Sequence, residues 1–257
     1  MLLFPAGGLT GHRLTDLLDR EGITHRSLPI EGMIRESLVI LEESTGQQYR
    51  FGMPGPVLSD EEWERCLHEL SAINPNPDYL VASGSLPPDV PDDFYAQVAR
   101  AGKDKGVKVI VDASGEALNL ALQEGVYLIK PNVREFKDLI GKDIRDESQI
   151  KVEARKMVKS GRCEVLVISL GAAGALFVSE DVAEHVSAPT VPIVSKVGAG
   201  DSMVAGMVLS LARGKPLRES VLFGMAAGAA AVMTPGTELC RREDAERLYE
   251  EMIAEAE

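Results

Sequence analysis

One short stretch of the sequence, residues 197–207 (VGAGDSMVAGM), combines a small-residue turn with a single acid. Glycines let backbone N–H groups approach a ligand closely, and the apolar run after Asp201 is typical of a buried helix with unpaired N–H groups in its first turn. Such a helix start attracts anions. Asp201 could cap this helix, or it could take a proton from a group that attacks a phosphate bound at residues 198–200. The stretch alone leaves both interpretations open.

Polar segments follow four apolar runs of the chain: SGSLPP at 83–88, DASGEAL at 112–118, KPNVREF at 130–136 and SLGAAGAL at 169–176. In an open α/β sheet the ligand lies beyond the carboxyl ends of the strands, so these segments are expected to meet in one cleft. Taken singly, each is also typical of an ordinary turn. The pattern GxxxxGK[ST] does not occur and the dinucleotide fingerprint is incomplete, which disfavours a P-loop NTPase and an NAD dehydrogenase.

Alternating apolar and amphipathic segments predict an α/β fold with a mainly parallel sheet and helices on both of its faces. The expected buried strands are the valine- and isoleucine-rich runs at 79–83, 107–112, 126–130 and 164–170. Helical patterns lie between them, at about 92–102, 115–123, 133–140 and 148–160.

Two regions depart from this alternation. Residues 37–51 (SLVILEESTGQQYRF) predict a hairpin that stands off the main sheet and could serve as a lid or a dimer contact. Residues 175–178 and 191–194 predict short antiparallel additions at the sheet edge, and three further helices are expected to close the chain.

The composition is that of an ordinary globular protein, with 45% hydrophobic and 26% charged residues in a chain of 257. A net charge of −13 without clustered lysine and arginine disfavours a nucleic-acid surface. The uncharged segment 220–237 is rich in alanine and glycine, which favours a buried helix over a membrane span. Three widely separated cysteines without a CxxC motif indicate free thiols, and we expect a cytoplasmic protein that binds neither nucleic acid nor membrane.

Taken together and in this order, SGSLPP, KPN-x-x-E, SLG-x-x-G and VGAGDSMVAG resemble the phosphofructokinase B family within the ribokinase-like sugar kinases. The segments FPAGGLTG, GQQYRFGMPG, DASGEAL and GTELC are most similar to its 6-phosphofructokinase branch. The resemblance implies a three-layer ribokinase-like fold and the ATP-dependent phosphorylation of fructose 6-phosphate to fructose 1,6-bisphosphate, a step of glycolysis. The alternatives are 1-phosphofructokinase, tagatose-6-phosphate kinase and a nucleotide-binding but inactive relative.

The resemblance also implies where the reaction takes place. Asp201 matches the catalytic base of the family, which activates the sugar hydroxyl and so also contacts the substrate. Its anion hole is matched by the backbone amides of Gly198, Ala199 and Gly200. Phosphoryl transfer needs positioning and charge neutralisation more than covalent chemistry, so a helix N-terminus and a base are suited to it.

Further positions match the ligand-binding residues of the family. The nucleotide site, with ATP and Mg²⁺, is matched by Lys130, Asn132, Glu135, Ser169 and Gly171, of which Glu135 would hold the magnesium through water. Arg35 and Ser85 match positions that hold the sugar phosphate.

A monovalent cation, K⁺, is also implied next to the anion hole. Its carbonyl ligands would come from Ser195, Val197, Val232 and Gly236. Glu238 stands where the branch tends to have arginine, which changes the local charge.

Family chains begin with a further segment that supplies a first strand, lid strands and sugar contacts, and no part of this sequence matches it. The resemblance therefore implies one ribokinase-like domain over 1–257, shortened at its N-terminus, with a lid at about 34–53 that joins two copies in a homodimer. Because that segment carries part of the sugar site, we expect this chain to bind MgATP and to phosphorylate fructose 6-phosphate weakly or not at all.

Overall fold

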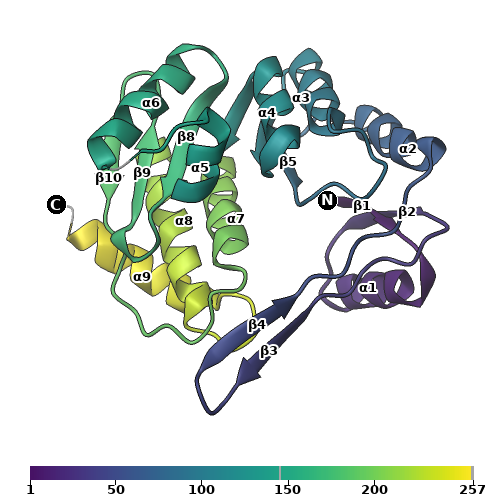
Figure 1. Ribbon diagram of the computed structural model, residues 1–257, viewed down its shortest axis with the longest axis horizontal. Helices are drawn as coiled ribbons and strands as arrows, with labels where there is room; N and C mark the ends of the chain where they lie inside the picture. Colours follow the sequence, from purple (N-terminus) through teal and green to yellow (C-terminus); the bar gives the residue numbers. More distant parts are fainter. Residues whose placement is uncertain (145, 256–257) are drawn as a thin grey trace.

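A six-stranded sheet forms the centre of the computed structural model, which describes residues 1–144 and 146–255 (Figure 1). The strand order is β10-β9-β8-β7-β6-β5. The four parallel strands are β5 (Tyr79–Ser83), β6 (Lys108–Asp112), β7 (Val126–Ile129) and β8 (Cys163–Ser169). Two antiparallel strands, β9 (Ala175–Val178) and β10 (Ala183–Val186), extend the sheet beyond β8. The predicted mainly parallel sheet is confirmed. Residue 145 and residues 256–257, where the predicted domain ends, lie outside the described residues.

Helices cover both faces of this sheet and complete a three-layer α/β fold. One face packs against α3 (Phe94–Asp104), α4 (Gly115–Glu124), α5 (Val133–Ile140) and α6 (Glu147–Lys159). The opposite face packs against α7 (Ala199–Ala212), α8 (Leu217–Val232) and α9 (Arg242–Ala254). Fully buried side chains such as Phe136 on the first face and Phe177 on the second fill the two interfaces.

Glycines allow α7 and α8 to pack closely. A Cβ atom added to Gly224 of α8 would lie 2.4 Å from the Met207 Cγ and 2.7 Å from the Met203 carbonyl oxygen. Since the backbone oxygen cannot rotate away, only glycine fits there without moving a helix. This contact fixes the direction of α7, whose N-terminus carries the GAGD segment.

The N-terminal residues form a smaller unit of their own (Figure 1). The parallel strands β1 (Leu2–Ala6) and β2 (His25–Pro29) flank α1 (Gly8–Arg20) in the sequence and make a separate two-stranded sheet. The next helix, α2 (Asp60–Ser71), packs against β1 and β2 as well as against α3. In the described part of the chain no strand pairs with the outer edge of β5, where Val81 is 40% exposed.

The predicted hairpin is confirmed as β3 (Leu38–Glu42) and β4 (Gln47–Phe51). It extends from the N-terminal unit toward the segment between α8 and α9 (Figure 1). Its Gln48 Oε1 lies 3.5 Å from the hydroxyl oxygen of Ser195, which precedes α7. The hairpin therefore contacts the segment that precedes the GAGD turn.

The prediction of an edge strand at 191–194 is wrong, and β10 takes that place in the sheet. Pro192 lies inside the predicted stretch and Pro189 two residues before it, and proline has no N–H group to contribute to a strand ladder. Residues 183–186 instead follow β9 directly, because the Ser179 N–H donates to the Val182 carbonyl oxygen at 2.8 Å and closes a turn. The three predicted closing helices are confirmed as α7, α8 and α9.

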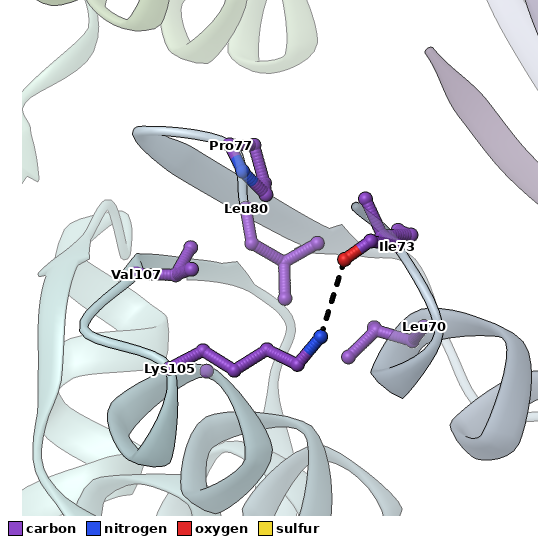
Figure 2. Close-up of a pocket in the computed structure, with 7 residues that line it drawn as sticks. Leu70, Ile73, Pro77, Leu80, Lys105 and Val107 are labelled. Carbon is purple, nitrogen blue, oxygen red and sulfur yellow. Dashed lines mark hydrogen bonds between the residues drawn. The ribbon is translucent and has the colours of Figure 1, made fainter. Parts of the chain in front are cut away.

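A small apolar pocket lies between α2 and the α3–β6 turn (Figure 2). Its volume is about 10 Å³, which is room for about one water molecule. The Lys105 ammonium donates to the carbonyl oxygens of Ile73, at 3.2 Å, and Ser71. These bonds fasten the end of α2 to the main body, so this pocket is a packing feature and not a ligand site.

None of the described helices is long and apolar enough to span a membrane.

Candidate active site

The N-terminus of α7 presents open backbone amides beside Asp201. Gly198 precedes the helix with φ +77° and ψ −1°, a left-handed conformation that favours glycine. Asp201 lies in the first turn and is exposed. Within the described residues its carboxylate makes no hydrogen bond or ion pair, so it does not cap the helix in this structure. An exposed carboxylate next to free helix N–H groups is the arrangement that a proton acceptor at an anion site requires.

A charged pair lies against this helix start. Lys130 directly follows β7 and is 8% exposed, and its ammonium lies 3.7 Å from the Asp112 Oδ1 at the end of β6. The same ammonium lies 3.3 Å from the point that a Cβ atom on Gly200 would occupy. The structure thus brings Lys130 to the predicted anion hole, as the convergence of strand ends requires.

The carboxyl group of Asp112 has a raised pKa, chiefly because burial disfavours its charged form. The negative charges of Asp201 and Glu135 raise this pKa further, while the Lys130 ammonium lowers it. These interactions place all four charged groups in one neighbourhood. Asp112 was not among the predicted site residues, although it opens the DASGEAL segment; only the tertiary pairing with Lys130 distinguishes it from a turn residue.

Asn132 and Glu135 hold the start of α5 through a capping box. The Asn132 Oδ1 accepts a hydrogen bond from the Glu135 N–H, and the Glu135 Oε2 accepts one from the Asn132 N–H, both at 2.9 Å. The predicted nucleotide and magnesium residues therefore have a structural role as well. The box uses one carboxylate oxygen of Glu135 and leaves Oε1 for another contact.

The end of β8 lies beside this helix start. The Ser169 N–H donates to the Pro131 carbonyl oxygen at 3.0 Å, and Ser169 and Asn132 form an isolated parallel bridge. Two residues on, Gly171 has φ +63° and begins a single helical turn, η1 (Gly171–Ala173). The five predicted nucleotide residues thus lie at the end of β8 and in the segments that directly follow β7 and β8.

Arg35 and Ser85 contact each other just beyond the end of β5. The Arg35 Nη2 donates to the Ser85 Oγ at 3.0 Å, and Nη1 donates to the Met53 carbonyl oxygen at 3.5 Å. Ser85 lies just beyond β5, where the Gly84 N–H donates to the Asp112 carbonyl oxygen at 3.1 Å. This backbone contact connects the Arg35–Ser85 pair to the charged group around Lys130. A cavity of about 320 Å³ adjoins the pair and is lined mainly by apolar residues of the N-terminal unit.

The loop that carries Arg35 is fastened by a buried acid, Glu62, which is 7% exposed. Its Oε1 accepts the Glu31 N–H at 2.7 Å and its Oε2 accepts the Ser59 N–H at 2.9 Å. The two backbone N–H groups, that of Ser59 first, lower the pKa of this carboxyl group. Our sequence analysis missed Glu62, although Ser59-x-x-Glu62 before a helical pattern is the signature of a capping box.

The four predicted potassium ligands also lie close together. The Ser195 hydroxyl donates to the Gly236 carbonyl oxygen at 2.6 Å, and the Val197 N–H donates to that hydroxyl at 3.3 Å. The Val232 carbonyl oxygen accepts two N–H groups, from Val194 at 2.7 Å and from Ser195 at 3.2 Å. Both lone pairs of this oxygen are thus engaged, so Val232 fits a cation less well than the other three residues.

The family profile described as pfkB family carbohydrate kinase matches residues 1–244. The ATP-dependent 6-phosphofructokinase isozyme 2 of Mycobacterium tuberculosis (strain H37Rv) is 43% identical over 96% of this chain and 73% of its own length. The protein of the same name from Escherichia coli (strain K12) is 40% identical over 96% of this chain and 80% of its own length.

Solved structures show the same likeness. The structure of phosphofructokinase-2 from Escherichia coli in complex with substrates and products superposes with a TM-score of 0.93 at 39% identity, covering 98% of this chain and 81% of that one. The same enzyme in complex with fructose-6-phosphate gives a TM-score of 0.91 at 38% identity, with the same coverage. Arabidopsis thaliana ribokinase, at 24% identity and a TM-score of 0.74, shares the fold.

Proposed function

Because this chain belongs to the pfkB family of carbohydrate kinases, we propose that it is an ATP-dependent 6-phosphofructokinase, which converts fructose 6-phosphate to fructose 1,6-bisphosphate. One observation carries the proposal: the exposed Asp201 lies in the first turn of α7, and the Lys130 ammonium lies beside Gly200 of the same turn. The identity of 40–43% to 6-phosphofructokinases, against 30–31% to 1-phosphofructokinases, favours this sugar phosphate.

Arg35 and Ser85 would hold the phosphate that the sugar already carries. The guanidinium of Arg35 offers a planar set of N–H donors that matches two oxygens of a phosphate, and the Ser85 hydroxyl adds another donor. Because Arg35 already contacts Ser85 at 3.0 Å, less side-chain freedom is lost when a phosphate binds beside the pair.

At the other end of the sugar, Asp201 would accept the proton of the attacking hydroxyl. The hydroxyl oxygen then forms a bond to the γ-phosphorus of ATP, the bond between that phosphorus and the bridging oxygen breaks, and ADP leaves with the bonding electrons. The amides of residues 198–200 and the Lys130 ammonium would neutralise the charge on the transferred group. Asn132, Ser169 and Gly171 would position the nucleotide phosphates on the neighbouring strand ends.

The residues present fit a magnesium ion carried by ATP. Magnesium usually takes one or two carboxylates together with substrate phosphates and water, and Glu135 has one carboxylate oxygen outside its capping box. When bound, the ion would neutralise phosphate charge and orient the transferred group.

We propose that a potassium ion would be held by Ser195, Val197 and Gly236. Val232 would join them only if the two hydrogen bonds that its carbonyl oxygen accepts rearrange.

The exposed face of the hairpin supports a homodimer. Leu38 and Phe51 are opposite each other in the register, as are Ile40 and Tyr49, so the four side chains share one face, and each is 45–58% exposed. Contiguous apolar surface of this kind is typical of an interface between chains.

We further propose that residues 1–257 act as one domain with this hairpin as its lid. We also propose that the protein is cytoplasmic, because Cys66, Cys163 and Cys240 are free thiols, as is usual in a reducing compartment.

Replacing Asp201 by asparagine tests the proposal. We expect Asp201→Asn to lose at least about 10²-fold in turnover, because a general base contributes about 10²–10⁴-fold. Affinity for MgATP, measured by calorimetry, should change by no more than about threefold, roughly 0.7 kcal/mol. Asp181→Asn, an exposed acid in the β9–β10 turn, serves as the control.

The assay should follow ADP release with fructose 6-phosphate, fructose 1-phosphate and tagatose 6-phosphate. Highest kcat/KM on either of the other two sugars would reassign the substrate. Binding of MgATP without transfer to any of the three would favour the inactive relative. Near-normal turnover of Asp201→Asn would rule out Asp201 as the base.

A further inference from the structure

The ion pair between Asp112 and Lys130 is largely enclosed by the protein. The Lys130 side chain is 9% exposed and the Asp112 side chain 19%. In the part of the chain that the structure describes, Asp112 is the one carboxylate within 4 Å of the Lys130 ammonium. Because an enclosed ammonium needs a counter-charge, this single contact decides where the ammonium lies.

The strand register places the two residues side by side. Val111 of β6 pairs with Ile129 of β7, so Asp112 and Lys130 are the next residues along two parallel strands. Both belong to rigid strand ends. The Lys130 stem then carries the ammonium to the Gly200 backbone, in the first turn of α7. Asp112 is therefore anchored to the sheet while it holds a charge beside the anion hole.

Two other acids, Asp201 and Glu135, lie in the same neighbourhood as Asp112. Asp201 and Glu135 are close enough to raise the pKa of Asp112, yet neither forms an ion pair with Lys130 among the described residues. If the ammonium paired with Asp201, the base would be a poorer proton acceptor and the anion hole would lose its cation. The observed pairing leaves Asp201 open and the cation next to the helix start.

We propose that Asp112 is a positioning residue, which fixes the Lys130 ammonium beside the anion hole and keeps it from pairing with Asp201. This inference rests on the proposed kinase function, in which Lys130 neutralises charge on the transferred phosphoryl group. Asp112 touches neither substrate in this account and acts only through Lys130. Removing the Asp112 carboxylate should therefore lower kcat only in a protein that still contains Lys130.

A double-mutant cycle of Asp112→Asn and Lys130→Met tests this dependence. We expect Asp112→Asn to lower kcat by about 10²-fold, the cost of misplacing a catalytic group by about 1 Å, and to change KM for fructose 6-phosphate by less than about threefold. The double variant should be no slower than Lys130→Met alone. Asp143→Asn, which breaks the exposed Lys137–Asp143 pair, is the matched control and should behave as wild type.

Three results would overturn the proposal. One is wild-type kcat in Asp112→Asn. Another is a double variant more than about tenfold, or 1.4 kcal/mol, slower than Lys130→Met, which would show that Asp112 acts independently. The third is a rise in KM for fructose 6-phosphate equal to the fall in kcat. Should Asp112→Asn fail to fold, Asp112→Glu replaces it in the same cycle: it keeps the charge but moves the carboxylate, so kcat should again fall, and wild-type kcat in this variant would overturn the proposal.

Failure of the kinase assignment would be seen separately. If the wild-type protein phosphorylates none of the sugar phosphates, the proposed function is wrong, and the same cycle is measured as MgATP affinity by calorimetry. Asp112→Asn should then weaken MgATP binding, while the double variant should match Lys130→Met. Additive losses in affinity would contradict the positioning role.

Discussion

Replacing Glu62 by glutamine tests how firmly the Arg35 loop is held. The buried carboxylate accepts the N–H groups of Glu31 and Ser59 at 2.7 and 2.9 Å. Glutamine keeps the shape but has one acceptor oxygen, so one N–H group would face an NH₂ group. Losing one bond to a charged group costs about 1.5–3 kcal/mol, and leaving a donor unpaired costs about 1–3 kcal/mol. We expect the free energy of unfolding to fall by about 2 kcal/mol and Tm by about 4–8 °C.

The same substitution should change sugar binding selectively. The Glu31 contact fastens the loop that ends in Arg35, whereas the proposed nucleotide residues lie between β7 and α5, in the first turn of α5, at the end of β8 and in η1. We expect KM for fructose 6-phosphate to rise between about 3-fold and about 30-fold, the upper limit being 2 kcal/mol expressed wholly in binding. KM for MgATP should stay the same. Steady-state kinetics with each substrate varied in turn give both constants.

The pH dependence of this effect has a definite sign. The pKa of Glu62 is lowered in the folded protein from its ordinary value of 4.5, by the Ser59 N–H first and the Glu31 N–H next. Its contribution to stability is therefore present above about pH 4.5 and lost as the pH falls through the folded-state pKa. The stability difference between wild type and Glu62→Gln should shrink below pH 4.5. Urea unfolding at several pH values measures it.

Glu61→Gln, on the same helical turn but exposed, is the control for these measurements. Equal losses of Tm in Glu61→Gln and Glu62→Gln would refute the structural reasoning. An equal rise in KM for both substrates would refute the link between Glu62 and the Arg35 loop.

Two further predictions concern Glu135 and the apolar face of the hairpin. Glu135→Gln should raise the magnesium concentration needed for half-maximal rate and leave KM for fructose 6-phosphate unchanged, which a magnesium titration of the rate would show; an unchanged magnesium dependence would contradict the assignment. Ile40→Asp should shift the protein toward monomer in sedimentation velocity, because it places a charge on the apolar face of the hairpin, whereas Leu41→Asp, on the opposite face, should do so less. Equal effects of the two would exclude that face as the interface.

Local sequence patterns predicted the main sheet well because each strand is a short, apolar run with turn residues at both ends. The strand at 79–83 and the helix at 133–140 have the predicted bounds. The helix at 133–140 begins at a capping box, Asn132-x-x-Glu135, which is a signal contained in four residues. The prediction at 191–194 was wrong because it gave more weight to two valines and an isoleucine than to Pro192, which removes a ladder donor.

The sequence predicted those residues of the candidate site that stand in segments with a recognisable pattern, and it missed the others. Asp201, Lys130 and Glu135 stand in such segments, and the structure brings their charges into one neighbourhood. Asp112 and Glu62 were missed because their importance lies in partners far away in the sequence: Lys130 for one and Glu31 for the other. Whether the separate β1–β2 sheet would pair with β5 likewise depends on tertiary packing that strand patterns do not encode.

The position of α2 has a mechanical consequence for the reaction. Its first turn holds the Arg35 loop through Glu62, its last turn pairs Glu69 with Arg26 of β2 at 2.5 Å, and its end is fastened to the main body by Lys105. The helix therefore joins the loop that carries Arg35 to the body that carries Lys130 and Asp201 through three polar contacts. If the proposed sites are correct, the stiffness of α2 contributes to the distance between the acceptor hydroxyl and the phosphorus, although the helix itself is remote from both.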